Sequence, residues 1–151
     1  MTLYKSIKIG IEAAVAKTTQ HLSFIYVADM AKAYFEIAEK SASKEAYNLS
    51  DGNFYTQSQL NAYIKAAMGK KGIKININPA FLKILAFGAE LRSLITGKIS
   101  ILTRNKVNEL QEINWKVDAT KIKKKIGFHA ETDLESGIHK TFKWYKKHGW
   151  I

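Results

Sequence analysis

The sequence contains no cysteine and only one proline. Without cysteine, disulfides and thiolate metal sites are excluded, and the composition fits the cytoplasmic location that we expect. The four histidines are scattered along the chain, and none has a carboxylate at the spacing of a metal-ligand pair such as H-E-x-x-H. We therefore predict no metal site.

Long hydrophobic runs are also lacking. The most apolar region, residues 81–95, is interrupted by Lys83, Glu90 and Arg92. It is shorter than the roughly 20 residues that a membrane span needs, and we interpret it as a buried or half-buried helix. Residues 1–16 carry two lysines, Lys5 and Lys8, and do not form the continuous apolar core of a secretory signal. We expect no membrane association.

Glycine-rich nucleotide motifs are missing as well. The nine glycines form neither G-x-x-G-x-x-G nor G-x-G-x-x-G after a strand, and G-x-x-x-x-G-K-[ST] occurs only as a fragment at residues 96–100. A dinucleotide needs close backbone approach at a helix N-terminus, which glycines permit. There is no G-x-S-x-G elbow either. We therefore expect no cofactor to bind this chain by itself.

One short pattern could carry chemistry. Residues 4–8 (YKSIK) match Y-x-x-x-K, in which one helical turn brings a lysine ammonium towards a tyrosine hydroxyl and lowers its pKa. The same pattern arises when an exposed lysine lies beside an aromatic residue on an amphipathic helix. We favour this second interpretation and predict no catalytic residue in the chain.

Acidic residues are scarce, because 13 Asp and Glu face 24 Lys and Arg and leave a net charge of +11. Such a surface attracts polyanions. One hypothesis is therefore a small basic module that binds nucleic acid or an acidic protein. The other, which we favour, is a solvated lysine-rich surface, with nucleic acid an unlikely partner. The first hypothesis would use lysines together with tryptophans for base stacking, namely Lys121, Lys123, Lys124, Lys125, Lys143, Lys146, Lys147, Trp144 and Trp150.

What is present fits a single domain spanning residues 1–151, with 46% apolar residues to form a core. Local patterns predict a mixed α/β fold that is rich in helices and has short strands. Helices are predicted over residues 2–15 and 103–111 and after Asp29, Thr56, Asn78, Asp118 and Thr132. Strands are predicted over residues 22–27, 46–50, 54–55 and 73–77, with a turn at 51–53.

Helix ends have specific signals. Asp29 is predicted to cap one helix, and Thr56 and Thr132 each begin a capping-box pattern. Asn78 precedes Pro79 and is expected to start another helix. Two glycines, Gly69 and Gly127, are placed to end helices in a left-handed conformation.

Four segments, in this order, resemble the C-terminal half of an extended short-chain dehydrogenase/reductase of the NAD-dependent epimerase/dehydratase family. FIYVADMAKA (24–33) resembles the family's strand, Val-x-Asp and small-residue helix. AYNLSDG (46–52) resembles the next strand and turn. NWKVDATKIKKKIGF (114–128) resembles a helix with a Leu-Gly-Phe-like ending, and DLESGIHKTFKWYKKHGW (133–150) resembles the closing helix. The resemblance implies the C-terminal portion of a Rossmann-type enzyme, without its dinucleotide-binding half.

The resemblance also implies a substrate-binding role for three residues. In the nucleotide-sugar epimerases, the strand aligned with residues 22–27 begins with a phosphate-binding arginine, followed two residues later by an aromatic residue. Here Leu22 replaces the arginine and Phe24 keeps the aromatic. This version looks nearer to the hydroxysteroid-dehydrogenase-like and dihydroflavonol-reductase-like members. Tyr26 shares a face with Phe24, and Arg104 lies near the family's other phosphate-binding arginine. The alternatives are a core position for the two aromatics and an exposed helix start for Arg104.

The function that follows from the resemblance is substrate binding within an NAD(P)-dependent epimerase, dehydratase or reductase. The whole enzyme would pass hydride between NAD or NADP and a nucleotide sugar, or a hydrophobic alcohol or ketone. This chain alone is expected to show no turnover. Apolar faces that normally contact the missing half could also form a homodimer. A scaffold or interaction domain that has lost catalysis is the remaining alternative.

Overall fold

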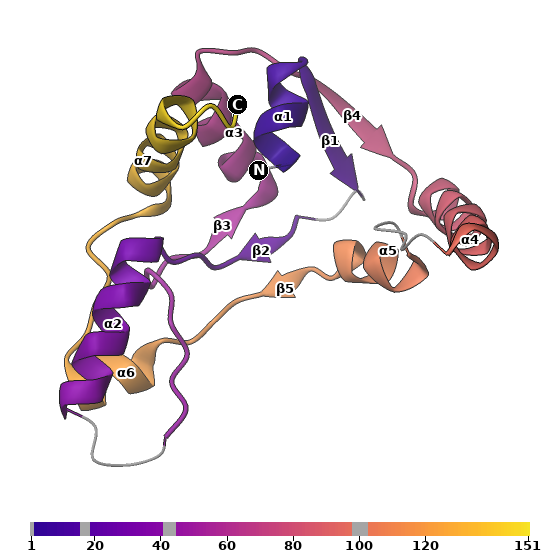
Figure 1. Cartoon of the computed structure of the whole chain (residues 1–151). Helices are drawn as coiled ribbons and strands as arrows, with labels where there is room; N and C mark the ends of the chain where they lie inside the picture. The colour runs from indigo at the N-terminus through magenta and orange to yellow at the C-terminus, as the bar shows by residue number, and fades with distance from the viewer. Residues whose placement is uncertain (1, 16–18, 41–44, 98–102) are drawn as a thin grey trace.

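The structure is a computed structural model that describes residues 2–15, 19–40, 45–97 and 103–151 (Figure 1). Its helices are α1 (Thr2–Lys8), α2 (Val27–Lys40), α3 (Gln57–Met68), α4 (Pro79–Thr96), α5 (Arg104–Gln111), α6 (Thr120–Ile126) and α7 (Leu134–Lys147). Its strands are β1 (Ile11–Val15), β2 (His21–Leu22), β3 (Tyr55–Thr56), β4 (Ile73–Ile77) and β5 (Asn114–Trp115). The predicted fold class, mixed α/β with many helices and short strands, is confirmed.

The strands form two small sheets. In the first, β1 and β4 are parallel, with Ile11 opposite Ile73 and Val15 opposite Ile77. In the second, the order is β3-β2-β5, with β2 antiparallel to β3 and parallel to β5. Each strand of the second sheet has only two paired residues, so helix packing rather than the sheet organises this part of the molecule.

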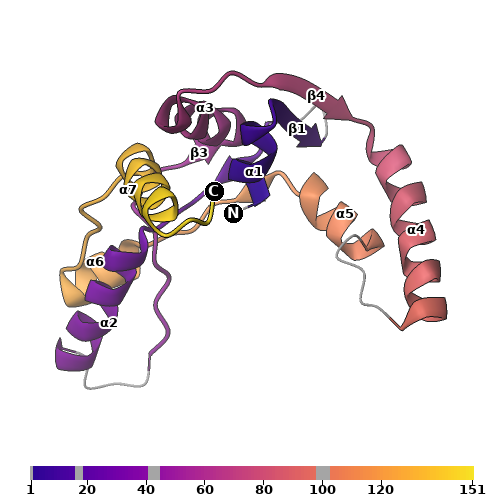
Figure 2. The same ribbon diagram turned by 45° about the horizontal axis from the view of Figure 1, so that its top comes forward.

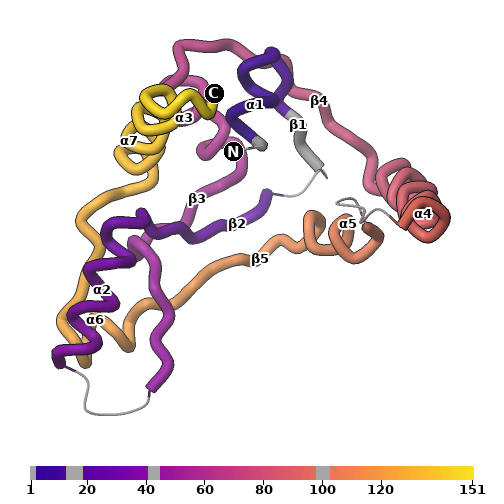
Figure 3. Tube along the Cα trace, in the orientation of Figure 1, coloured from indigo at the N-terminus to yellow at the C-terminus, as the bar shows by residue number. Residues whose placement is uncertain are grey.

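Three hydrophobic clusters hold the elements together. The central cluster joins α1, α3 and α7 around Ile7, Ile64 and Ile138. A second joins α2 to α6, and a third joins α4 to α5. Figures 1 and 2 show the α2–α6 and α4–α5 pairs at opposite ends of the molecule, with the central cluster between them. The tube in Figure 3 shows that the C-terminus lies near α1.

The helix predicted over residues 2–15 is only half right. The helix ends at Lys8, Gly10 has a φ of 80°, and the chain continues as β1. The backbone N–H of Ile73 donates to the carbonyl of Gly10 at 2.9 Å, which begins the ladder with β4. Spacing within one segment could not reveal this pairing, because the partner strand lies far along the chain.

Two predicted strands are also corrected. Of residues 22–27, only Leu22 belongs to a ladder, and Val27 already begins α2. The carbonyl of Phe24 instead accepts a hydrogen bond from the N–H of Asp51, at 2.8 Å. Residues 46–50 form no strand. The prediction at 54–55 is shifted by one residue, since β3 is Tyr55–Thr56.

Helix ends were predicted with mixed success. Thr56 forms the expected capping box with Gln59, and the side chain of Asn78 accepts the N–H of Ala80 at 2.9 Å. The glycines Gly69 and Gly127 end α3 and α6 with φ values of 60° and 81°.

The two other caps were wrong. Asp29 lies inside the first turn of α2, where its buried carboxylate accepts the N–H of Thr132 at 2.9 Å. The cap of α7 is Asp133, one residue after Thr132, and its carboxylate accepts the N–H of Ser136 at 2.9 Å. Thr132 is held by other contacts: its N–H donates to Asp29, and its hydroxyl accepts the ammonium of Lys140 at 3.2 Å.

Candidate substrate-binding site

A cavity of about 370 Å³ lies where α7 faces the segment that connects β2 to α2. Phe24 and Tyr26 both line it, together with Ile25 and Val27 of the same segment. From the other side, Gly137, Ile138 and Thr141 of α7 contribute to its wall. The cavity thus joins segments more than a hundred residues apart in sequence.

Two backbone hydrogen bonds hold the aromatic wall. The carbonyl of Phe24 accepts the N–H of Asp51 at 2.8 Å, and the carbonyl of Tyr26 accepts the N–H of Met30 at 2.9 Å, which starts α2. The ring of Phe24 lies 6.2 Å from that of Tyr55, in a tilted arrangement. The wall is therefore fixed at both ends, by a turn and by a helix start.

Gly137 is the residue that lets α7 approach Tyr26. A Cβ atom at this position would lie 3.4 Å from Cδ2 of Tyr26, which is ordinary contact with no room for more. A side chain longer than alanine would therefore displace the Tyr26 ring or occupy the cavity. Gly137 is buried and lies between Leu134 and Ile138, which both belong to the central core.

Tyr55 supports the base of the site. Its hydroxyl donates to the carboxylate of Asp51 at 2.5 Å and accepts the N–H of Leu134 at 3.3 Å. Burial, reinforced by the hydrogen bond to Asp51, raises the pKa of Tyr55 to about 12. The hydroxyl is thus a stable neutral link between the turn at 51–53 and the start of α7, and it is not poised to lose its proton.

The polar side chains that line the cavity carry carboxylates and hydroxyls. Asp51 and Asp133 both line it, and hydrogen bonds from the side chain and backbone of Ser136 lower the pKa of Asp133. The ammonium of Lys140 lies 5.1 Å from the ring centre of Tyr26 and donates to the hydroxyl of Thr132 at 3.2 Å. The rim therefore offers hydroxyls and carboxylates, with one nearby cation.

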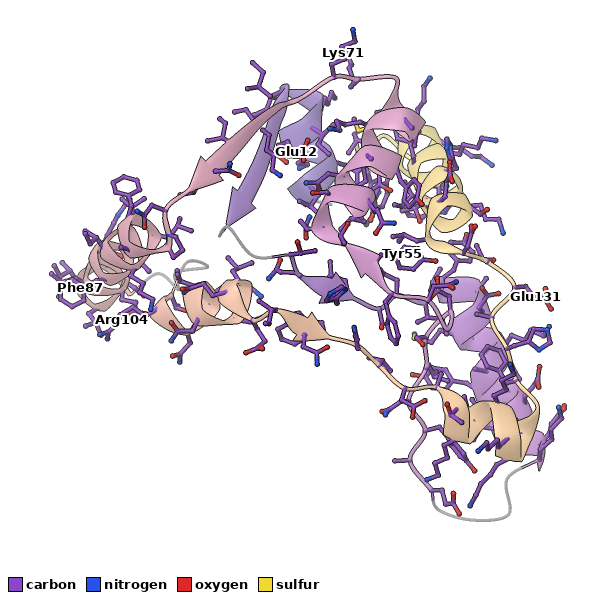
Figure 4. The ribbon with its side chains drawn as sticks, turned by 180° about the vertical axis from the view of Figure 1, so that it is seen from behind. Glu12, Tyr55, Lys71, Phe87, Arg104 and Glu131 are labelled. Carbon is purple, nitrogen blue, oxygen red and sulfur yellow. The ribbon has the colours of Figure 1, made fainter. Side chains whose placement is uncertain are left out.

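Arg104, the third residue proposed from the sequence, does not line this cavity. It begins α5, where its Nε lies 2.9 Å from Glu90 and its guanidinium 5.5 Å from the ring centre of Phe87. Hydrogen bonds from its backbone N–H and side chain lower the pKa of Glu90. Figure 4 shows Arg104 beside Phe87, well away from Tyr55. The structure thus brings Phe24 and Tyr26 together and leaves Arg104 elsewhere.

Tyr4, in the Y-x-x-x-K pattern, is a core residue. Its hydroxyl donates to the carbonyl of Ile138 at 3.3 Å, and its ring packs edge-on against Tyr145. Burial and the neighbouring Tyr145 raise the pKa of Tyr4 to about 12. A tyrosine that acts as an acid or base near neutral pH needs a lowered pKa, so this environment opposes catalysis.

The lysines and tryptophans of the nucleic-acid hypothesis are partly engaged within the chain. Lys121 and Lys125 both pair with Glu45, at 3.1 and 2.7 Å, and their hydrogen bonds lower the pKa of Glu45 to about 2. Trp144 stacks on His148 with ring centres 4.1 Å apart, and Trp150 stacks on Tyr145. Two of the seven lysines and one face of each tryptophan are thus already engaged by other groups of this chain.

The described ranges offer neither a cluster of metal ligands nor a membrane-spanning helix. No group of three or more His, Asp or Glu side chains is placed there to hold a metal ion. None of the described helices combines the length and the apolar character required to cross a bilayer.

Sequence analysis missed Gly137, which lines the pocket, and two residues that contact its lining, Tyr55 and Lys140. Gly137 had a usable signal, since it interrupts the inner face of the predicted last helix, where glycine often marks close approach. Tyr55 and Lys140 had none, because their roles depend on contacts with distant segments.

No protein-family model and no curated protein matches the sequence. Solved structures do match. The crystal structure of gox2253 has a TM-score of 0.70 at 17% identity, covering 99% of this chain and 44% of that one. The dTDP-glucose 4,6-dehydratase of Bacillus anthracis, in complex with NAD, has a TM-score of 0.67 at 14% identity, covering 99% of this chain and 39% of that one.

A third similar structure is the UDP-glucose 4-epimerase of Thermotoga maritima with UDP-glucose, with a TM-score of 0.67 at 18% identity, covering 97% of this chain and 38% of that one. The chain therefore spans less than half the length of each of these structures. The part that matches is their C-terminal portion. The chain thus has the fold of the C-terminal portion of an extended short-chain dehydrogenase/reductase of the epimerase and dehydratase type.

Proposed function

We propose that this chain is the substrate-binding, C-terminal portion of an NAD(P)-dependent epimerase, dehydratase or related reductase, and that it is not catalytic alone. The observation that carries the proposal is the cavity between the Phe24–Tyr26 wall and α7, in a fold found in such enzymes. A volume of about 370 Å³ lies in the range of small-molecule pockets.

The cavity favours a neutral ligand that carries hydroxyl or carbonyl groups. Its walls are mostly apolar, and the carboxylates of Asp51 and Asp133 at its rim would repel a diphosphate. Leu22 offers no positive charge where the nucleotide-sugar epimerases have arginine. A hydrophobic alcohol or ketone therefore fits better than a nucleotide sugar.

Each pocket group has a role in this proposal. Phe24 and Tyr26 pack against the apolar part of the ligand, which excludes water. The hydroxyls of Thr132 and Thr141 and the carboxylate of Asp133 hydrogen-bond the ligand's polar groups. Binding of this kind orients the reacting carbon for chemistry that another part of the enzyme performs.

The described residues do not offer a dinucleotide site. The glycines with positive φ occur singly, at helix ends and turns, and not as a cluster between a strand and a helix: they are Gly10, Gly52, Gly69, Gly97, Gly127 and Gly149. The pyrophosphate cradle of a Rossmann fold needs several glycines within one such turn. NAD or NADP would supply hydride only when bound by a separate dinucleotide-binding half. The cytoplasmic location and the phosphate-binding role of Arg104 stay predictions.

The proposal is tested by NMR amide-shift mapping with two probes, a hydroxysteroid and UDP-glucose. We expect saturable shifts at residues 24–27 and along α7 with the hydroxysteroid, and weaker ones with UDP-glucose. Gly137→Leu should abolish them because its side chain occupies the cavity. Glu135→Leu, at an exposed position of the same helix, is the matched control and should retain binding.

Two outcomes would contradict the proposal. The first is the absence of saturable binding by either probe, or binding that Gly137→Leu leaves unchanged. The second is binding of NAD or NADP, or carbonyl reduction, by this chain alone. Sequencing the natural reading frame around the chain is a separate test, since an in-frame glycine-rich strand–turn–helix segment would supply the half that the proposal requires.

A further inference from the structure

Helix α4 has apolar residues on two sides. On one side, Leu82 and Ala86 are buried against Val107 of α5. On the other side, seven large apolar side chains are exposed, and Figures 1 and 2 show α4 at the outer end of the molecule. These seven residues define the α4 stripe: Phe81, Ile84, Leu85, Phe87, Leu91, Leu94 and Ile95.

The α4 stripe has the spacing of a helix-pairing seam. Phe81, Ile84, Gly88, Leu91 and Ile95 follow one another at intervals of three, four, three and four residues, which is the alternation of a and d positions in a coiled coil. The other members of the stripe lie immediately beside this seam, at the e and g positions. The spacing therefore provides a surface that a second helix can match along its full length.

Gly88 is the one residue of the seam without a side chain. No atom lies within 4 Å of a Cβ placed there, and its backbone is not left-handed, so nothing described in this chain requires glycine. Apart from proline, glycine is the least favourable residue in a helix interior. Its position leaves a gap in the middle of the seam, where another helix can approach closely.

The exposed area is large enough for a stable interface. The stripe residues are between 46% and 83% exposed, which for seven large side chains corresponds to on the order of 800 Å² of apolar surface. Monomeric proteins rarely expose contiguous apolar patches beyond about 600 Å². About 800 Å² from each partner is the usual size of a specific interface.

We propose that the α4 stripe is the surface through which two copies of this chain associate, as an antiparallel pair of α4 helices about a twofold axis. A surface with large side chains on both sides of one central gap is complementary to itself. Antiparallel pairing places Gly88 opposite Ile84 or Leu91 of the second copy, so a large side chain fills the gap. Parallel pairing would place one Gly88 opposite the other and leave the gap empty. Antiparallel pairing also opposes the helix dipoles.

Sedimentation equilibrium of the purified chain tests the interface. We expect the wild type to be dimeric at concentrations on the order of 10–100 μM. Leu91→Glu should raise the dimer dissociation constant at least about thirty-fold, as does loss of a central interface side chain. Phe35→Glu is the matched control, because Phe35 is 73% exposed on α2 and lies outside the stripe. Circular dichroism establishes that each variant is folded.

Single cysteines test the direction of the pairing, because the chain has no cysteine of its own. In an antiparallel pair the two Gly88→Cys residues lie within about one helical turn of one another, and a short bismaleimide should join them. The two Ile95→Cys residues lie at opposite ends of the pair, more than about 15 Å apart at 1.5 Å rise per residue, and should not be joined.

The proposal is overturned by a wild type that stays monomeric throughout this concentration range, including one that is monomeric yet sediments with phosphatidylserine vesicles. It is equally overturned if Leu91→Glu and Phe35→Glu have the same effect on the dimer dissociation constant. Failure of Gly88→Cys to cross-link, or cross-linking of Ile95→Cys as efficient as that of Gly88→Cys, would overturn the antiparallel arrangement. None of these results depends on whether the cavity beside Tyr26 binds a substrate.

Discussion

The hydroxyl of Tyr55 lies 2.5 Å from the carboxylate of Asp51 and donates a hydrogen bond to it. The same hydroxyl accepts the N–H of Leu134, so one side chain joins the turn at 51–53 to the first residue of α7. Asp51 also holds the carbonyl of Phe24 through its backbone N–H. Three segments that line the proposed pocket therefore meet at this one pair.

Tyr55→Phe should destabilise the protein by about 1–3 kcal/mol, because it leaves both the Asp51 carboxylate and the Leu134 N–H without this partner in a buried setting. The free energy of unfolding in urea measures the loss. Tyr34→Phe is the control, since Tyr34 is 58% exposed, and it should change stability little. Equal losses in the two variants would show that the Tyr55 hydroxyl contributes nothing specific.

Stability should fall at alkaline pH. Burial raises the pKa values of Tyr4 and Tyr55 from 10.0 to about 12. Because a phenol in the unfolded chain ionises first, the contribution of these two groups is fully present below pH 10 and is lost as the pH rises towards 12. Unfolding followed with phenolate absorbance measures this loss. The double variant with phenylalanine at both positions should be less sensitive across the same pH window.

Glu12 should make the protein sensitive to acid. Burial opposes its ionisation, but hydrogen bonds from Lys65 at 2.6 Å and Asn61 at 3.1 Å outweigh this effect and lower the pKa of Glu12 below 4.5. This contribution is present above pH 4.5 and disappears as the pH falls through the lower pKa of the folded state.

Replacing either partner of this pair tests its contribution. Lys65→Met should cost about 2–3 kcal/mol at neutral pH, because Glu12 keeps its charge without its main partner. Glu12→Gln should flatten the acid dependence of unfolding, whereas Glu39→Gln, at an exposed position of α2, should not. If the wild type, Glu12→Gln and Glu39→Gln all show the same acid dependence of unfolding, Glu12 does not have this role.

Gly127→Ala should destabilise the protein by about 1–2 kcal/mol, because Gly127 ends α6 with a φ of 81°, where a Cβ atom is strained. Gly127→Asn should cost less, since asparagine tolerates the left-handed region better. Thermal unfolding compares the two. Nothing lies within 4 Å of a Cβ at this position, so the strain is conformational and not a clash.

Arg104→Ala should leave ligand binding in the cavity unchanged, because Arg104 is engaged with Glu90 and does not line the cavity. Phe24→Leu should weaken binding of a hydrophobic probe about ten-fold through lost aromatic contact. Calorimetric titration distinguishes the two variants. A loss of UDP-glucose binding in Arg104→Ala would instead support the phosphate-binding role that the family resemblance implies.

Local signals predicted the parts of the fold that depend on neighbours in sequence. The capping box of Thr56, the Asn78-Pro79 start and the alternating isoleucines of residues 73–77 all act within a few residues, and each prediction is confirmed. β1 was missed because its partner is β4, whose residues lie about sixty positions further along. The helix-like spacing of residues 2–15 has less effect on the conformation of residues 11–15 than the hydrogen bonds between β1 and β4.

The same distinction applies to the candidate site. Phe24 and Tyr26 both line the cavity, but Ile25 and Val27 line it too, and these residues do not form the strand on which the predicted alternation depends. The opposite wall comes from α7. The glycine on its inner face indicates close approach by another segment, but no pattern within residues 133–150 identifies that segment as the one that carries Tyr26. The resemblance to a family supplied the fold, because a shared order of segments carries long-range information that periodicity does not.

The hydrogen bond from Tyr4 to the carbonyl of Ile138 spans 134 positions. The ring of Tyr4 is therefore enclosed only once α1 and α7 have met. Formation of this core depends on contacts between segments far apart in sequence, which slows folding relative to a core made of local contacts.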